Sequence, residues 1–293
     1  VHVAGLPEAT TCAWSVPEAS GGRDGSFRTA PGAEGNAHLV LYGDTRTNHD
    51  DHAAVAAAIA AESPDLLIHT GDMVALSTEP TWQTFFEILA PVLGGTPIVP
   101  VIGNHESDLL RSWYLGWFLP PGGFEDGTNT SFDYGPARFI TINVLRDPAR
   151  PGFIDWLRAE LAAARARPFR FVLLHHPLHT FSNHSPWEDG REFVEPLLKE
   201  YDVTAVFSGH NHCYERFDVE GVMHVTLGGG GAPLYGISQH AIPEEAGLLQ
   251  AEGKFFHYLA LDLSPQVAHA TIVRVGPEGT DVFESFDLMP ANP

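Results

Sequence analysis

Residues 203–216 read VTAVFSGHNHCYER, a stretch that combines a predicted strand with a candidate site. Residues 203–207 are β-branched and apolar, which is typical of a buried strand in a parallel sheet. Gly209 ends this run, so His210 and His212 are predicted to lie in a loop at the carboxyl end of the strand. Residues two apart in an extended chain point the same way, so both imidazoles can face one point in space. The alternative is a polar turn with two surface histidines, and the other strand ends decide between the two.

Four other predicted strands end in the same way. The polar residues that follow them are Asp44 in YGDTR, Asp72 in HTGDMV, Asn104 and His105 in IGNHE, and His175 and His176 in VLLHHP. Each of these taken alone fits a turn, a helix cap or simple packing. Together they place oxygen and imidazole groups at five strand ends, where open α/β sheets bind their ligands. The set therefore predicts a metal site.

The donor types indicate which metals the site takes. Carboxylate, amide and imidazole groups without a thiolate suit Mn, Fe or Zn. Two such ions about 3.5–4 Å apart need a bridging carboxylate, and as a pair they clamp a phosphoryl group. We therefore expect two metal ions whose identity the sequence leaves open.

From residue 37 onward, strands alternate with helices, and after residue 213 the pattern is all-β. The predicted strands are 38–42, 65–69, 97–102, 131–134, 138–144, 169–174, 203–207, 223–227, 255–263, 267–275 and 282–288, and the predicted helices are 51–62, 81–89, 106–118, 154–167 and 191–199. This order predicts an α/β fold with two sheets packed as a sandwich.

Composition limits the possible partners. The chain has 293 residues and a formal charge of −21, which argues against a nucleic-acid polymer surface or an anionic membrane surface. The sequence has no apolar run long enough to span a bilayer. Two cysteines are too few for a disulfide framework or a thiolate zinc site, and whether Cys12 and Cys213 pair is left open. An anionic substrate must be attracted by something locally positive, and a metal cluster would serve.

The amino-terminal residues differ from the rest of the chain. Residues 1–36 are rich in Gly, Pro, Ser and Thr, and 11–16 and 25–29 are predicted strands. A hairpin this small is not stable alone, so it must pack on the remainder. The chain begins at Val1 without a methionine, so we expect a secreted or extracytoplasmic protein whose signal was removed or whose chain was cut.

The sequence resembles the calcineurin-like metallophosphoesterases, and within them the purple acid phosphatase branch. The resemblance rests on five blocks in order, GDTR, GDMVA, GNHE, VLLH and GHNHCYER, and on GGGGAPLY at 228–235. It implies a two-sheet αββα sandwich over residues 37–293, preceded by a short β segment over 1–36. Residues 1–30 resemble the last strands of the fibronectin-type domain that precedes the phosphatase domain in that branch, with Cys12 where an aromatic residue is usual.

The resemblance also implies a ligand set. Metal one takes Asp44, Asp72 and His212, while metal two takes Asp72, Asn104, His175 and His210, so that Asp72 bridges the ions. His105 would contact the phosphoryl oxygens or assist the leaving group, and His184 falls where the family has a substrate-facing histidine.

Two positions depart from the family pattern. Ala75 stands where purple acid phosphatases have a tyrosine ligand, and Arg46 stands where the wider superfamily has a histidine. Metal one is therefore left with three protein ligands. A guanidinium has no free lone pair, so Arg46 is expected to contact phosphate bidentately or to hold a nearby carboxylate, unless it is simply a surface arginine.

Together these features predict a dinuclear metal-dependent phosphoesterase. It would hydrolyse a small phosphate monoester or diester by in-line attack of a metal-bound hydroxide. The alternatives are a metal-binding but catalytically weak interaction module and a hydrolase of other esters that uses the same cluster. The natural substrate, the preference between monoester and diester, and the oligomeric state stay open.

Overall fold

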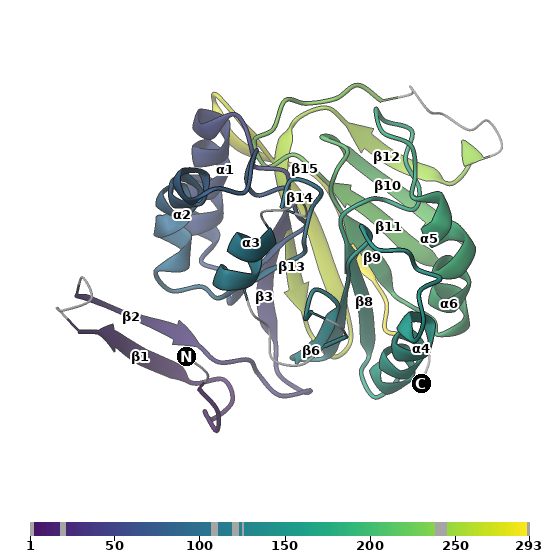
Figure 1. Cartoon of the computed structure of the whole chain (residues 1–293), viewed down its shortest axis with the longest axis horizontal. Coiled ribbons are helices and arrows are strands. Elements are labelled where there is room, and N and C mark those ends of the chain that lie inside the picture. Colours follow the sequence, from purple (N-terminus) through teal and green to yellow (C-terminus); the bar gives the residue numbers. More distant parts are fainter. Residues whose placement is uncertain are drawn as a thin grey trace.

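Two mixed β-sheets lie face to face at the centre of the molecule, with helices on the outer face of each sheet (Figure 1). The computed structural model describes residues 3–17, 22–106, 111–118, 123–124, 126–237 and 245–291. A six-stranded sheet has the order β15-β14-β13-β3-β4-β5, and a seven-stranded sheet has the order β12-β10-β11-β9-β8-β7-β6. The predicted two-sheet α/β sandwich is thereby confirmed.

The strands largely follow the predicted ranges. The six-stranded sheet consists of β3 (Ala37–Tyr42), β4 (Leu66–His69), β5 (Ile98–Pro100), β13 (Phe256–Leu263), β14 (Ala268–Gly276) and β15 (Gly279–Leu288). The seven-stranded sheet consists of β6 (Thr130–Tyr134), β7 (Ala137–Ile142), β8 (Phe169–Leu174), β9 (Ala205–Ser208), β10 (Tyr214–Val219), β11 (Val222–Leu227) and β12 (Leu249–Gly253). Sequence reasoning missed β10 and β12, because charged side chains in both, and Gln250 in β12, hide the apolar alternation.

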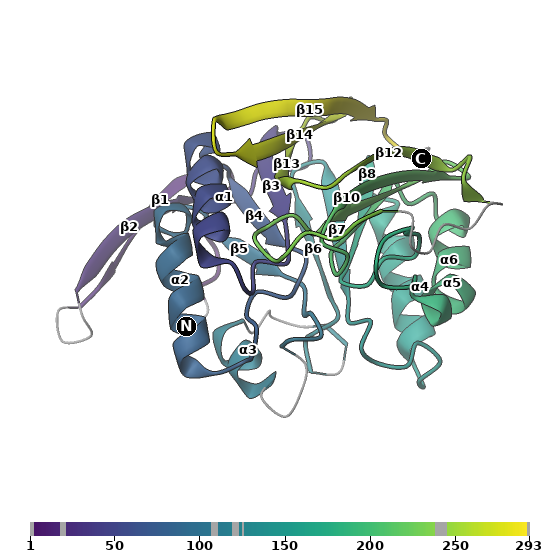
Figure 2. The same ribbon diagram turned by 90° about the horizontal axis from the view of Figure 1, so that it is seen from above.

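Helices cover both outer faces of the sandwich (Figures 1 and 2). On the side of the six-stranded sheet lie α1 (His49–Glu62), α2 (Glu79–Leu93) and α3 (Arg111–Trp117), and on the other side lie α4 (Phe153–Ala164), α5 (Glu188–Phe193) and α6 (Glu195–Glu200). The predicted helix 191–199 is two short helices, since Pro196 cannot donate the backbone hydrogen bond that would continue the first. Of the helix predicted over 106–118, Arg111–Trp117 is helical and Glu106 is not, while residues 107–110 lie outside the described residues.

Local sequence explains why α2 forms and where it packs. Thr78 caps its first turn together with Thr81 in a capping box. Trp82, Phe85 and Leu89 follow at spacings of three and four residues, so all three lie on one buried face. Removing the Leu89 side chain beyond Cβ would cost about 2–5 kcal/mol, the usual range for a buried leucine.

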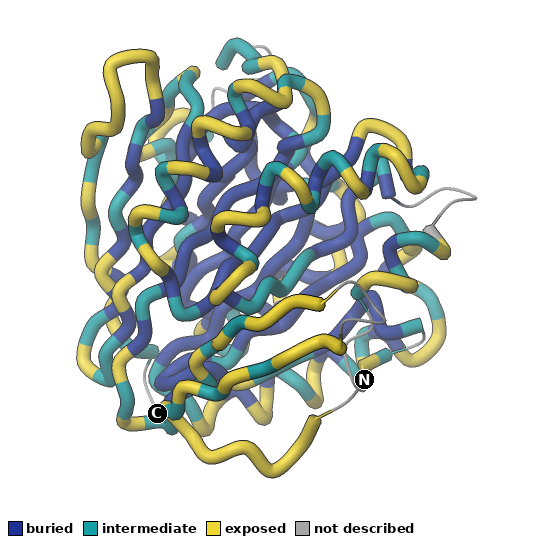
Figure 3. Tube along the Cα trace, turned by 90° about the vertical axis from the view of Figure 1, so that its left-hand side faces the viewer, coloured by how far each residue is buried: buried dark blue, intermediate teal, exposed yellow. Residues whose placement is uncertain are grey.

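Three apolar clusters hold the layers together. One lies between the two sheets, a second lies under α1, α2 and α3, and a third lies under α4 and α6. Figure 3 shows the central strands buried and the outer turns of the helices exposed. With both faces of each sheet covered, the loops at the strand ends are the free edge on which a site can form.

A separate two-stranded sheet precedes the sandwich. It consists of β1 (Thr11–Val16) and β2 (Arg23–Arg28), paired antiparallel and lying beside the end that carries α2 (Figure 1). Arg28 joins it to the sandwich through an ion pair with Asp65 at 3.1 Å. Cys12 and Cys213 are both free thiols. Within the described part of the chain, none of the helices has the length and apolar character needed to cross a membrane.

Candidate metal centre

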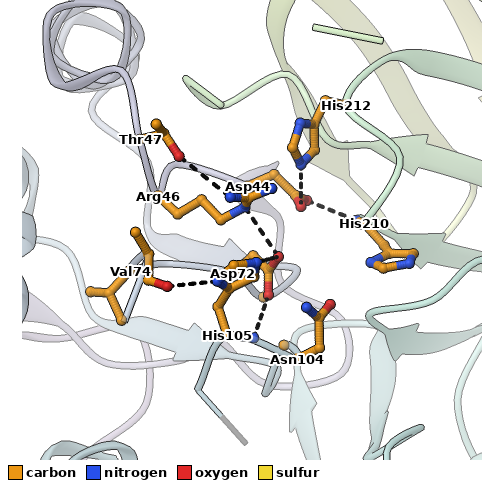
Figure 4. Close-up of polar contacts among 12 residues, drawn as sticks. Asp44, Arg46, Thr47, Asp72, Val74, Asn104, His105, His210 and His212 are labelled. Carbon is orange, nitrogen blue, oxygen red and sulfur yellow. Dashed lines mark hydrogen bonds and ion pairs between the residues drawn. The ribbon is translucent and has the colours of Figure 1, made fainter. Parts of the chain in front are cut away.

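The carboxyl ends of five strands, β3, β4 and β5 from one sheet and β8 and β9 from the other, meet at one edge of the sandwich. The predicted residues in the turns that follow these strands are Asp44, Arg46, Asp72, Asn104, His105, His175, His210 and His212. Figure 4 shows Asp44 and Asp72 close together at the centre, with Arg46, His105 and His212 around them. The strand ends thus bring side chains from both sheets to one place.

Asp72 and His175 form the first pair of this cluster. Asp72 is 2% exposed, and its Oδ1 lies 3.2 Å from Nε2 of His175. His175 donates its Nδ1–H to the carbonyl oxygen of Thr70 at 2.8 Å, which turns Nε2 toward Asp72 and toward Oδ1 of Asn104 at 3.1 Å. A histidine that binds metal through one nitrogen is usually held in this way through the other.

Asp44 and His212 form a second pair with the same arrangement. His212 donates its Nδ1–H to the carbonyl oxygen of Pro233 at 2.7 Å, and its Nε2 lies 3.4 Å from Oδ1 of Asp44. Asp44 Oδ2 accepts the backbone N–H of His210 at 2.9 Å, whereas its buried Oδ1 has no hydrogen-bond partner. A buried carboxylate oxygen without a hydrogen-bond donor is costly, and a bound cation would satisfy it.

The backbone is strained at three of these positions. Asp44, Asp72 and His210 have φ values of 59°, 55° and 67°, in the left-handed region that non-glycine residues rarely adopt. The preceding turns are crowded as well, because a Cβ at Gly209 would lie 2.4 Å from Oδ2 of Asp44. Such strain clusters at functional sites, where the surrounding structure enforces it.

The charges of the first pair depend on each other. Burial alone raises the pKa of Asp72, but the charge and hydrogen bonds of His175, together with those of His105, hold that pKa well below its usual range. Burial lowers the pKa of His175, but Asp72, together with Asp44 and the carbonyl of Thr70, raises it to about 9. A metal ion bound here must displace the proton of His175, because only neutral imidazole can ligate.

Arg46 and His105 flank Asp72 on the open side. Nε of Arg46 lies 3.5 Å from Oδ2 of Asp72. The backbone N–H of His105 donates to Oδ1 of Asp72 at 3.0 Å, while Nε2 of its ring lies 3.8 Å from Oδ2. Both side chains are partly exposed, at 19% and 28%, so they lie where a ligand can reach them.

Three further histidine rings extend the cluster. His210 stacks against His184 with ring centroids 4.3 Å apart, and its ring is tilted against that of His176 with centroids 3.9 Å apart. Burial lowers the pKa of His176 to about 3 and that of His210 well below its usual value, so both rings are neutral and keep a lone pair. His184 lies beside His210 through this ring contact.

Glu106 is a buried residue of this cluster whose role sequence reasoning missed. Its fully buried carboxyl group accepts the backbone N–H groups of Gly103 at 2.9 Å, Asp72 at 3.0 Å and Val74 at 3.1 Å. Burial and the nearby Asp72 raise its pKa to about 8. Glu106 thus fixes the turn after β4 to the turn after β5. Its place in the GNHE block was the available signal.

Asn211, between the two histidines of the GHNH block, has a similar role that was also missed. It is buried, and it accepts the backbone N–H of His184 at 2.8 Å and donates to the carbonyl oxygen of His184 at 3.0 Å. It also donates to Oγ1 of Thr180 at 2.8 Å. Tyr235, from the GGGGAPLY stretch, stacks on His212 at 4.0 Å. These contacts hold the loop of His184 against the loop of His210 and His212.

The site has the donors of a metallohydrolase. Asp44, Asp72 and His175 bring ligand atoms within 4.8 Å of one another, and so do His175, His176 and His210. Comparison with known families agrees with this class, because residues 37–214 match the model of the calcineurin-like phosphoesterases. The chain belongs to that family.

Two relatives of this chain are named purple acid phosphatases. Purple acid phosphatase 22 of Arabidopsis thaliana is 28% identical over 234 residues, which cover 72% of this chain and 54% of the relative. A protein of the same plant named probable inactive purple acid phosphatase 9 is 26% identical over 200 residues, or 55% of this chain and 31% of the relative. The chain spans about half, or less, of the length of these relatives.

A solved structure shares the fold. The purple acid phosphatase PPD1 from yellow lupin (Lupinus luteus) seeds superposes with a TM-score of 0.79 at 19% identity, over 91% of this chain and 56% of that chain. A likeness at this identity establishes the two-sheet architecture.

Proposed function

We propose that this protein is a dinuclear metal-dependent phosphoesterase acting on small phosphate esters. The observation that carries the proposal is the position of Asp72, whose carboxylate lies close to Asp44 and to His175. Asp72 is thus close both to Asp44, which pairs with His212, and to His175, which contacts Asn104. The first ion would be held by Asp44, Asp72 and His212, and the second by Asp72, Asn104, His175 and His210.

The residues present fit this role. Oδ1 of Asp44 is a buried acceptor without a donor, and His175 and His212 each present Nε2 to a carboxylate while a backbone carbonyl holds the other nitrogen. Oxygen and imidazole donors without thiolate favour Mn, Fe or Zn. Two ions of this kind supply polarisation of a phosphoryl group and a nucleophile drawn from water near neutral pH.

Three side chains around the cluster would bind and position the substrate. The guanidinium of Arg46 is always charged and can bind two phosphoryl oxygens at once. His105 keeps its Nε2 on the open side of Asp72, where it can contact a phosphoryl oxygen or give a proton to the leaving oxygen. His184 borders the same space through its contact with His210.

A second candidate is a metal-binding module with little catalysis. Ala75 contributes no side-chain donor to the first ion, and one relative bears the name of a probable inactive phosphatase. The two candidates differ in turnover and in the number of ions retained.

The test combines elemental analysis with a hydrolysis screen of p-nitrophenyl phosphate, bis-p-nitrophenyl phosphate and cyclic nucleotides. We expect two ions per chain at this site, counted as the ions that Asp72→Ala removes, and turnover of at least one ester. Asp72→Ala should lose both ions and lower the rate by at least about 100-fold, whereas His175→Ala should lose one ion. Asp50→Ala, on the exposed first turn of α1, is the control that should keep both. One ion without turnover would favour the module, and near-native activity of Asp72→Ala would refute the dinuclear site.

A further inference from the structure

A second cluster of potential ligands lies inside the seven-stranded side of the molecule. His179 comes from the loop after β8, Glu195 begins α6, and His224 lies on β11. These residues are 3%, 7% and 4% exposed, and their ligand atoms lie within 4.8 Å of one another. None of them belongs to the candidate dinuclear site.

His224 is the unexplained member of this cluster. Both of its ring nitrogens are buried and neither has a hydrogen-bond partner. Its ring lies edge-on to that of His179, with centroids 4.9 Å apart. Burial, followed by the charge of His179, lowers the pKa of His224 to about 3, so the ring is neutral and keeps a free lone pair. A buried neutral imidazole is unsatisfied until a hydrogen-bond donor or a metal ion binds the lone pair of its unprotonated nitrogen.

His179 is held as metal-binding histidines usually are. Its Nε2 lies 3.1 Å from Oε1 of Glu195, and its Nδ1 lies 3.1 Å from Oε2 of Glu245. Glu245 is fixed in turn by an ion pair with Arg191. A carboxylate behind one ring nitrogen orients the other nitrogen toward a metal and increases its basicity.

A purely ionic network explains only part of this arrangement. A positively charged His179 between Glu195 and Glu245, with Lys199 at 3.6 Å from Glu195, satisfies those groups without a metal. It leaves both nitrogens of His224 without a partner. Lys199 also reaches the exposed Glu220 at 3.2 Å, so it can leave Glu195 without losing all its pairing.

We propose that His179, Glu195 and His224 bind a divalent transition-metal ion, with zinc as the expected occupant. Two imidazoles and one carboxylate form an established zinc donor set, and their donor atoms stand about 3.3–3.4 Å apart in a tetrahedral site. Nε2 of His179 and Oε1 of Glu195 are 3.1 Å apart, close to that spacing, and a ring nitrogen of His224 lies within 4.8 Å of a ligand atom of each. The ion would join β11 and α6 to the loop that continues to His184, at a place that is closed to a substrate because all three ligands are buried.

The number of zinc ions bound by suitable variants distinguishes this site from the dinuclear centre. The chain is dialysed against a chelator, equilibrated with zinc in the low micromolar range and analysed for bound zinc. The double variant Asp72→Ala/His175→Ala removes the dinuclear centre and should keep one zinc ion, and adding His224→Leu should remove that ion. On its own, His224→Leu should lower the count by one while the protein still hydrolyses any ester that the wild type hydrolyses.

Two further variants control for loss of folding in His224→Leu. His52→Leu replaces another buried histidine, which contacts Tyr42 and belongs to no such ligand group, and it should leave the zinc count unchanged. Glu195→Gln keeps the size of the side chain and should weaken zinc binding by at least about tenfold. The proposal is overturned if the double variant binds no zinc, or if neither His224→Leu nor Glu195→Gln changes the count.

Discussion

Nδ1 of His105 lies 2.6 Å from the carbonyl oxygen of Ala75. The ring therefore donates this N–H to the backbone and keeps Nε2 on the side of Asp72. Ala75 occupies the position where the resemblance to purple acid phosphatases places a tyrosine ligand. In this chain the position contributes a backbone acceptor that orients His105, and its methyl side chain has no donor for a metal.

The first prediction concerns colour. The purple band of that branch arises from tyrosinate bound to ferric iron, and alanine cannot form such a bond. We expect the protein loaded with iron to be colourless, and its activity to depend on an added divalent ion such as Mn. A visible absorption spectrum of the iron-loaded protein checks this, with iron content measured on the same sample. A purple protein would show that the ligand assignment is wrong.

The second prediction concerns Arg46. Its Nε lies 3.5 Å from Oδ2 of Asp72, and the group is 19% exposed, so it can reach a bound phosphoryl group. Arg46→Ala should raise KM for phosphate esters about tenfold, which corresponds to about 1.4 kcal/mol. Arg46→Lys should recover only part of this loss, since lysine cannot bind bidentately.

A matched control for Arg46 is Arg158→Ala, which removes an exposed arginine paired with Glu200 on the far helices. It should leave KM unchanged. An unchanged KM in Arg46→Ala as well would leave Arg46 as an ordinary partner of Asp72.

Much of the site follows from local sequence. Asp44 and Asp72 each follow a glycine at the end of an apolar strand, so their place at the sheet edge could be predicted from adjacent residues. They lie together with His175 in the structure, and their role as ligands stays a prediction. Glu106 could not be assigned, because its acceptor role appears only when the turns after β4 and β5 are adjacent.

Other features depend on long-range packing. His179, Glu195 and His224 come from a loop, a helix and a strand with no regular spacing. Burial and the approach of their rings cannot be inferred from any one segment. The same holds for β10, where Glu215 and Arg216 are accepted in a strand because Glu215 finds buried hydrogen-bond donors and Arg216 pairs with Glu284.

The third prediction concerns the amino-terminal hairpin, which we propose to be the remnant of a preceding domain. Trp14 and Phe27 border a hollow formed with residues 93–97, and Arg28 pairs with Asp65. No proposed ligand lies in this segment. Deletion of residues 1–30 should lower the melting temperature by roughly 2–5 °C without changing the rate per folded molecule. Calorimetry and active-site-normalised kinetics check this, and a large loss of rate in folded protein would place the hairpin in the catalytic cleft.

The last prediction concerns Glu215, a fully buried carboxyl group on β10. It accepts hydrogen bonds from Oγ1 of Thr180 at 2.6 Å and from the backbone N–H of Phe181 at 2.8 Å. Burial raises its pKa from 4.5 to about 7, although these hydrogen bonds oppose the rise. Between these values the folded protein keeps a proton that the unfolded chain releases. This contribution to stability is complete below pH 4.5 and is lost as the pH rises to about 7.

The loss through Glu215 amounts to about 3.5 kcal/mol at most, since each pKa unit corresponds to about 1.4 kcal/mol. Glu215→Gln cannot ionise, so its free energy of unfolding should fall less steeply than that of the wild type between about pH 5 and about pH 8. Urea unfolding at several pH values measures this difference, and other titrating groups cancel because both proteins carry them. Glu192→Gln, on the exposed face of α5, should follow the wild-type curve. Parallel curves for Glu215→Gln and the wild type would mean that Glu215 is already ionised in the folded protein at pH 5.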